Sequence, residues 1–223
     1  MHDFEKLLSR SQQFSEKLVG LLDAAGGFAD GPRAEAAAAA AELCFEHGHA
    51  MRVLLEVGTP NSAAVLLRIQ YEALLRAAWL IYAASEAHLD KLSTSLTAES
   101  GAKAKNAKGA EDMLKELDAL LVATPTLRGL VLPLREIRKV SWAAMNSFVH
   151  GGLHPLTRTR EGFPLALASD LLRNSNGMLH MAARLLARLG PSVDAVSRVE
   201  TAFTGFTDCL PVVTVPETNS KRG

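Results

Sequence analysis

Apolar residues recur at intervals of three and four along nearly the whole chain, and no useful length of it alternates apolar with polar residues. Residues 3–24 are an example, with Phe14, Leu18, Leu21 and Leu22 at this spacing. Such spacing places apolar side chains on one face of an α-helix, whereas a half-buried strand needs a spacing of two. The sequence therefore predicts an all-α protein.

Glycine and proline residues interrupt the pattern and set the expected helix ends. We expect helices at residues 3–24, 33–57, 60–84, 85–99, 110–123, from after Pro133 to about His150, 165–189 and 192–207. With 223 residues, 48% of them hydrophobic, the chain can bury a core without disulfides or metals. This predicts one domain over residues 1–209, a single bundle of about seven or eight helices.

Three stretches fall outside the helical pattern. Residues 101–109 contain three lysines between two glycines, which predicts a mobile surface loop. Residues 157–164 are also expected to form a loop. Residues 210–223 include a β-prone segment flanked by prolines, so we expect an extended C-terminal tail there.

Charge and cysteine content narrow the functional class. Lys+Arg and Asp+Glu number 24 each, so bulk charge does not favour nucleic acid, and only a local basic patch would bind it. Cys44 and Cys209 make no disulfide framework, which favours a reducing compartment. The N-terminus lacks the features of a signal peptide, and the apolar run at 77–84 is too short to span a membrane. We expect a cytoplasmic protein.

No cofactor or metal site is expected. The sequence has no phosphate-binding or dinucleotide-binding glycine motif and no closely spaced cysteine pair. One Glu-x-x-His unit, formed by Glu46 and His49, has no second copy, whereas carboxylate di-iron bundles need two.

One segment carries charge inside a helix that is apolar on most sides. Between residues 66 and 82 the only ionised groups are Arg68, Glu72 and Arg76, which share a face because they stand at intervals of four. An apolar helix belongs in a core, where charges must be paired because unpaired burial costs several kcal/mol. We expect Glu72 to pair with both arginines.

A second polar stripe lies on the helix before Gly151 and Gly152. Its residues follow one another at strict four-residue steps: Arg138, Trp142, Asn146 and His150. The double glycine lets the chain turn, so we expect His154 to fold back near His150.

We expect the two stripes to face one another across the bundle and to form a polar seam. Its candidate ligand-binding residues are Arg68, Glu72, Arg76, Trp142, Asn146, His150 and His154. Two interpretations stay open. The polar seam is either a buried hydrogen-bonded network that fixes helix register, or a ligand or catalytic site, since coupled ionisable groups gather at functional sites.

The same stripes carry a resemblance to a known family. Two blocks resemble uncharacterised bacterial all-helical proteins that are similar to the HEPN superfamily: Leu67-Arg-Ile-Gln-Tyr-Glu-Ala-Leu-Leu-Arg76 and Trp142-Ala-Ala-Met-Asn-Ser-Phe-Val-His-Gly-Gly152. That superfamily is a helical fold of many toxins and phage-defence nucleases, and the resemblance covers residues 40–190 in this chain. It implies an all-helical fold and a role in defence or toxin systems.

The resemblance also implies a candidate catalytic motif. HEPN nucleases cut RNA without a metal, using an arginine that binds the scissile phosphate and a histidine for acid–base chemistry, with a polar residue after the arginine. No arginine stands at the required distance before His150, but Arg173 and Asn174 are followed by His180. Arg173 and His180 are about two helical turns apart and would share a face. Arg173, Asn174 and His180 are therefore the implied catalytic residues.

Two functions remain open from the sequence. The first is a non-enzymatic binding or regulatory protein of a phage-defence or toxin system, which binds a protein partner such as an antitoxin, or a small anion. The second is a metal-independent RNase that acts on RNA as a HEPN-like toxin. We also expect a homodimer. A cleft holding Arg173 and His180 would favour the RNase.

Overall fold

Nine α-helices and three short 3-10 turns make up the regular structure of the residues that the computed structural model describes, which are 2–27, 29–93, 97 and 108–212. The elements are α1 (His2–Asp23), α2 (Pro32–Glu56), α3 (Pro60–Tyr82), α4 (Glu86–Ser93), α6 (Ala110–Ala119), η2 (Pro125–Leu127), α7 (Arg128–Val149), α8 (Leu153–Glu161), α9 (Leu165–Leu189), α10 (Val193–Thr201), η3 (Ala202–Gly205) and η4 (Thr207–Cys209). No strand occurs in this part of the chain. The prediction of an all-α protein with a single domain is confirmed.

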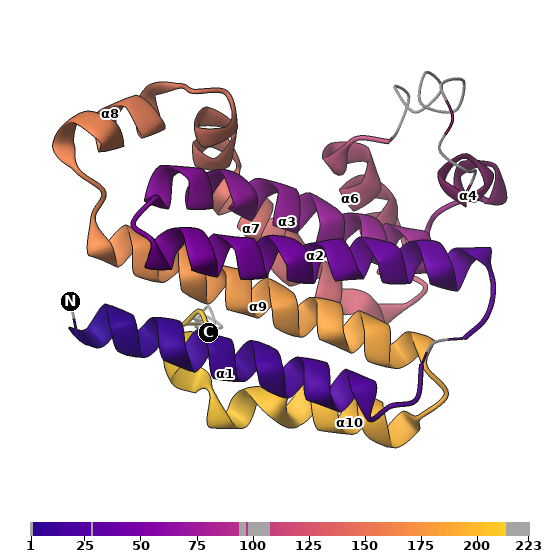
Figure 1. Cartoon of the computed structure of the whole chain (residues 1–223). Helices are drawn as coiled ribbons and strands as arrows, with labels where there is room; N and C mark the ends of the chain where they lie inside the picture. The colour runs from indigo at the N-terminus through magenta and orange to yellow at the C-terminus, as the bar shows by residue number, and fades with distance from the viewer. Residues whose placement is uncertain (1, 28, 94–96, 98–107, 213–223) are drawn as a thin grey trace, which may run out of the picture.

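The centre of the bundle is the antiparallel pair of α2 and α3, against which α9 packs (Figure 1). Small side chains allow this close approach, because four of the alanines in the run 36–41 are buried. Gly48 marks the tightest point: a Cβ atom there would lie 2.8 Å from Gln70 Nε2 and 2.9 Å from Leu179 Cδ2. The lack of a side chain at Gly48 thus lets α2 approach α3 and α9.

Two aromatic residues of α3 connect the core to the neighbouring helices. Both Tyr71 and Trp79 are fully buried. Tyr71 Oη donates to the Leu134 carbonyl of α7 at 3.1 Å, and Trp79 Nε1 donates to Glu116 Oε2 of α6 at 2.6 Å. Each ring therefore fills the interior while its polar atom has a partner, as buried Tyr and Trp require.

On the opposite side of α9, helix α1 packs together with α10 and the C-terminal turns (Figure 1). The buried Phe14 ring lies 5.1 Å from the ring of Phe206, measured between centroids. Asn176 of α9 donates through Nδ2 to Ser11 Oγ at 2.7 Å and to the Cys209 carbonyl at 2.8 Å. One buried amide therefore joins α1, α9 and η4.

The structure corrects several predicted boundaries. Residues 157–164 are not all loop, because α8 extends to Glu161; this helix buries none of its residues and so gives no core-facing pattern. Helix α7 begins at Arg128 and contains Pro133, which is exposed. Proline has no backbone N–H, so the helix loses one hydrogen bond there, yet it continues to Val149. The final helix ends at Thr201 and gives way to 3-10 turns.

Two predicted segments fall largely beyond the described residues. The lysine-rich loop at 101–109 is described only from residue 108, and the tail at 210–223 only as far as 212. Within the described chain, no helix combines the length and the apolar character that crossing a membrane requires.

Candidate functional site

Part of the polar seam forms as predicted, between α3 and α7. Arg68 Nε donates to Glu72 Oε1 at 2.9 Å, and Arg68 Nη1 donates to Asn146 Oδ1 on the facing helix. The Arg68 guanidinium carbon also lies 4.6 Å from the centre of the Trp142 ring. The structure thus brings together Arg68, Glu72, Trp142 and Asn146, four of the seven residues predicted for the polar seam.

Trp142 joins more groups than the sequence indicated. The guanidinium carbon of Arg138 lies 4.9 Å from the centre of the Trp142 ring, and Tyr71 meets that ring edge-on at 6.2 Å between centroids. Arg138 Nη2 donates to Glu111 Oε2 of α6 at 3.2 Å. Cation–π attraction holds the two arginines on one indole ring. The carboxylate of Glu111 comes from α6, so the spacing of residues within α3 and α7 could not predict it.

Arg76 departs from the predicted arrangement. Its Nη2 donates to the Lys108 carbonyl at 3.4 Å, while Nη1 is buried without a hydrogen-bond partner among the described residues. Burial lowers the pKa of Arg76, and the Glu72 carboxylate offsets part of that effect. Of the two expected pairings of Glu72, the one with Arg68 is a hydrogen bond, whereas Arg76 hydrogen-bonds the segment before α6 and interacts with Glu72 only through charge.

The two histidines lie at the surface of the α7–α8 turn. The turn itself folds back as expected: Gly151 has φ +63°, and the His154 backbone N–H donates to Ser147 Oγ at 3.0 Å. His150 and His154 are both exposed, and in the described part of the chain no hydrogen bond or ion pair joins either imidazole to Arg68, Glu72 or Asn146. The prediction that these histidines belong to the polar seam is not met, because both are exposed at the turn between α7 and α8.

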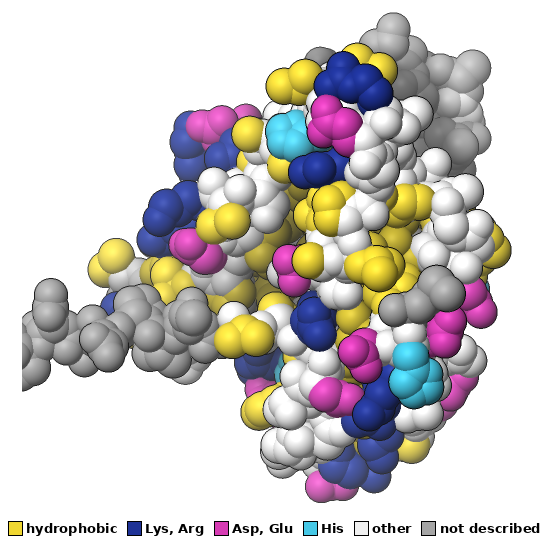
Figure 2. Space-filling model, turned by 90° about the vertical axis from the view of Figure 1, so that its left-hand side faces the viewer, with side chains coloured by type: hydrophobic (Ala, Val, Ile, Leu, Met, Phe, Trp, Pro, Cys, Tyr) yellow, Lys and Arg dark blue, Asp and Glu magenta, His cyan; other side chains and the backbone are white. Residues whose placement is uncertain are grey.

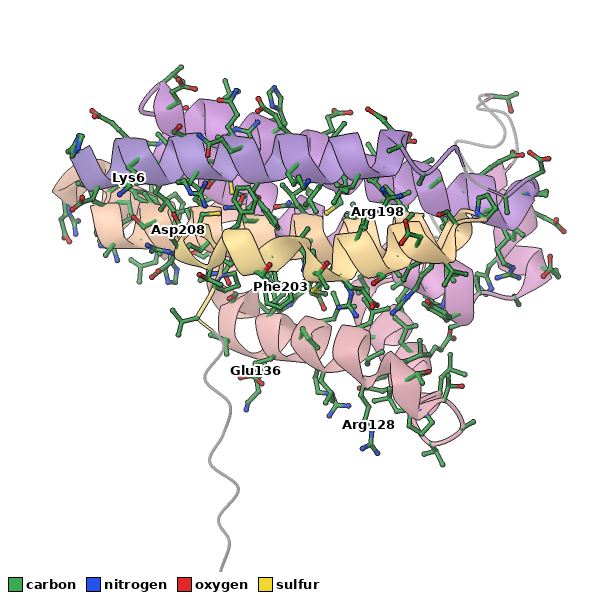
Figure 3. The ribbon with its side chains drawn as sticks, turned by 90° about the horizontal axis from the view of Figure 1, so that it is seen from below. Lys6, Arg128, Glu136, Arg198, Phe203 and Asp208 are labelled. Carbon is green, nitrogen blue, oxygen red and sulfur yellow. The ribbon has the colours of Figure 1, made fainter. Side chains whose placement is uncertain are left out.

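Arg173 and Asn174 lie in a pocket between α9 and the C-terminal turns, which we name the α9–η4 pocket. Its volume is about 630 Å³, and it is lined by Asp170, Arg173, Asn174, Thr207, Asp208, Leu210, Pro211 and Val212. Figure 3 shows Asp208 past the C-terminal end of α10, farther from Arg198 than Phe203 is. Local sequence patterns did not indicate the residues from 207 onwards, because they reach α9 only through the fold of the C-terminal turns.

The charges of the α9–η4 pocket differ in how firmly they are paired. Asp208 accepts two hydrogen bonds from Arg10, at 2.9 Å from Nε and 3.2 Å from Nη2, which hold the pKa of its carboxyl below the ordinary value. Asp170 Oδ1 lies 4.0 Å from Arg173 Nη1, a distance too long for a hydrogen bond. Asn174 Nδ2 donates to the Asp170 carbonyl at 2.8 Å, and its amide oxygen accepts no hydrogen bond from the described residues. Among the described residues that line the pocket, Arg173 is therefore the cation with room for a new anionic partner.

His180, the third residue of the implied catalytic motif, lies outside the lining of the α9–η4 pocket. Its Nε2 is 2.8 Å from the Val199 carbonyl, which can only accept, so Nε2 carries a hydrogen. The imidazole also contacts the rings of Phe14 and Phe203, and burial lowers the pKa of His180. The structure thus brings Arg173 and Asn174 together and places the imidazole against α10.

Metal binding finds no support in the described part of the chain. No group of three or more His, Cys, Asp and Glu side chains is arranged there to hold a metal ion. Both cysteines are free and buried, with the Cys44 thiol against the Met178 carbonyl and the Cys209 thiol against the Phe206 carbonyl.

Comparison with known proteins gives a family but no described function. No curated protein and no solved structure matches the chain. A family model matches residues 41–212, which run from the middle of α2 to the last described residue and include both the polar seam and the α9–η4 pocket. Because the match covers more than half of the sequence, the chain belongs to the family of unknown function DUF6988.

Proposed function

We propose that this is a non-enzymatic binding protein and that its α9–η4 pocket holds an acidic segment of a partner polypeptide. The observation that carries the proposal is the loosely paired guanidinium of Arg173, which lines the pocket 4.0 Å from the nearest Asp170 oxygen. Arginine favours two parallel hydrogen bonds to one carboxylate, and Asp170 is too distant to accept them. A carboxylate of a partner can accept both.

The opposite wall of the pocket supports a polypeptide rather than a small anion. Leu210, Pro211 and Val212 provide apolar surface, and Val212 is 87% exposed. Asn174 and Thr207 add polar groups for backbone hydrogen bonds. The volume of about 630 Å³ falls within the roughly 300–1,000 Å³ usual for ligand pockets. An acidic residue next to an apolar one would satisfy both walls.

The position of His180 supports binding over catalysis. An arginine–histidine nuclease needs an imidazole within reach of the phosphate that its arginine holds. Here the His180 ring is half-buried against Phe14 and Phe203, and its Nε2 is committed to the Val199 carbonyl. A regulatory role in phage defence or a toxin system, with an antitoxin-like partner, is part of the proposal and rests on the sequence resemblance alone.

Binding of a defined peptide tests the proposal. The probe is an acetylated, amidated tetrapeptide with one glutamate among three leucines, and the matched probe has glutamine in its place. We expect the glutamate peptide to bind at least about tenfold more tightly by calorimetry, which corresponds to about 1.4 kcal/mol. Arg173→Ala should remove that preference, whereas Arg198→Ala, an exposed arginine of α10 outside the pocket, should keep it.

Two results would overturn the proposal. One is equal affinity for the two peptides, or binding that Arg173→Ala leaves unchanged. The other is cleavage of single-stranded RNA by the intact chain in the presence of a chelator, lost in His180→Ala, because that would make the imidazole catalytic.

A further inference from the structure

Helix α8 has its polar and apolar sides reversed with respect to the rest of the molecule. Leu153 is 76% exposed and Leu156 is 66% exposed, and no residue of α8 is buried. Helix α8 contacts the bundle through Asn61 Nδ2, which donates to Thr159 Oγ1 at 3.0 Å, and through the His154 ring, whose centroid lies 5.8 Å from that of Phe148. A surface helix of a monomer normally buries its apolar stripe. Among the described residues, nothing covers the outward leucines of α8.

The orientation of α8 is fixed by the turn that precedes it. Gly151 has φ +63°, and a Cβ atom on Gly152 would lie 2.7 Å from Ser147 Oγ, so a side chain at either position would strain the turn. Ser147 Oγ then accepts the backbone N–H of His154 in the first turn of α8. The turn after α7 holds one end of α8, and the Asn61–Thr159 hydrogen bond holds the other. Held in this orientation, α8 exposes its leucines to solvent.

More apolar surface lies at the same end of the molecule. Leu165, at the start of α9, is 53% exposed, and this end of α9 lies beneath α8 (Figure 1). Figure 2 looks onto this end, where α8 lies towards the top, and shows hydrophobic side chains over the end with charged side chains of both signs among them. We call Leu153, Leu156 and Leu165 the α8 face. An apolar centre within a charged rim is the usual anatomy of a protein interface.

The charges beside the α8 face favour a second copy of this chain as the occupant. Arg160 and Glu161 are both exposed at the C-terminal end of α8, and Arg160 Nη2 donates to Glu161 Oε1 at 2.8 Å, so the two charges balance one another at this end of the helix. A surface with one dominant sign would repel its own copy, whereas a mixed rim can face itself across a twofold axis. A membrane surface would call for a basic rim without Glu161.

We propose that the α8 face is a symmetric contact between two copies of this chain, in which Leu153 and Leu156 of one copy pack on those of the other. This contact shares no residue with the α9–η4 pocket, so it stands or falls independently of the peptide-binding proposal. In a symmetric contact each substitution counts twice, which makes the surface sensitive to a single charged residue.

The first test measures the molar mass of the full chain by light scattering as it elutes from a size-exclusion column. We expect a mass of twice 23.9 kDa for the natural sequence and of one chain for the double variant Leu153→Glu/Leu156→Glu. The matched control is Leu132→Glu, since Leu132 is an exposed leucine of α7 away from the α8 face, and it should stay dimeric. Circular dichroism and the melting temperature show whether each variant folds.

Cysteine cross-linking gives a second test that needs no disruptive change. Cys44 and Cys209 are buried, so a thiol at position 156 is the reactive one in Leu156→Cys. A short bismaleimide should link two copies of Leu156→Cys and leave Leu132→Cys unlinked. The proposal is overturned by a monomeric natural chain at up to about 0.1 mM, a concentration that detects even weak dimers. A dimer that survives the double glutamate variant and does not cross-link overturns it equally.

Discussion

Arg68 of α3 donates to Asn146 Oδ1 of α7 and lies 4.6 Å from the centre of the Trp142 ring. One guanidinium therefore contacts two residues that are one helical turn apart on the facing helix. Because sliding either helix by a turn would break both contacts together, Arg68 fixes the register of α3 against α7.

The contribution of Trp142 to stability is the first prediction. Trp142→Ala removes the ring that contacts Arg68, Arg138 and Tyr71, so we expect a loss of about 2–4 kcal/mol in the free energy of unfolding. Trp142→Phe keeps an aromatic face and should cost about 1 kcal/mol. Urea denaturation measures both. A double-mutant cycle of Trp142→Ala with Arg68→Ala should give a coupling of about 0.5–1 kcal/mol, and zero coupling would contradict the stacking.

A smaller effect is expected for Glu72. A glutamate buried between two arginines would cost about 3–5 kcal/mol on removal. The structure leaves the Glu72 side chain 33% exposed and hydrogen-bonded to Arg68 but not to Arg76. Glu72→Ala should therefore destabilise the protein by only about 0.5–1 kcal/mol, as for a partly exposed ion pair. A loss above about 3 kcal/mol in the same urea titration would show that Glu72 supports both arginines after all.

Two glycines in helices should respond in opposite directions to alanine. Gly48→Ala places a Cβ 2.8 Å from Gln70 Nε2 and 2.9 Å from Leu179, so we expect a loss of about 1–3 kcal/mol from overpacking. Gly20 of α1 has nothing within 4 Å of that position, so Gly20→Ala should gain about 0.5–1 kcal/mol from helix propensity. Melting temperatures of the two variants suffice. Equal shifts would contradict the close packing at Gly48.

Stability should fall on the acid side because of His180. Burial and Arg184 lower the pKa of His180 below its ordinary value of 6.5, although the Val199 carbonyl and Glu200 oppose them. The unfolded chain then takes up a proton at higher pH than the folded chain, so this contribution is complete above pH 6.5 and is lost as the pH falls through the region below it.

His180→Gln isolates this effect, because glutamine keeps a donor for the Val199 carbonyl and does not titrate. We expect the stability of the natural protein, relative to the variant, to decline as the pH falls below 6.5 in denaturant titrations. A difference that stays constant as the pH falls would show that His180 is not desolvated.

Helix ends were predictable where the signal is local. Helix α9 spans Leu165–Leu189 as expected, because Pro164 precedes it and Gly190 follows it. Helix α8 escaped prediction because its leucines face solvent, so its sequence carries no periodicity directed at a core. The periodicity of apolar residues indicates which side of a helix is buried, so it cannot predict a helix that has no buried side.

The two candidate sites show a similar division. Four-residue spacing predicted that Arg68 and Asn146 lie on the inner faces of their helices, and the packing of α3 on α7 brings them into hydrogen-bond contact. The α9–η4 pocket depends on Asp208, held in place by Arg10 from the far end of the chain. Contacts across such separations follow from the complete fold, so no local spacing indicates them.

The amide of Asn176 makes the packing of α1 depend in part on residues near position 209. Its two acceptors, Ser11 and Cys209, belong to opposite ends of the sequence, and Phe14 packs against Phe206. A chain cut short before residue 206 would keep the packing of α1 on α9 but would lose the Cys209 carbonyl and the Phe206 ring. The Asn176 amide would then lack one of its two acceptors, and Phe14 would be partly uncovered.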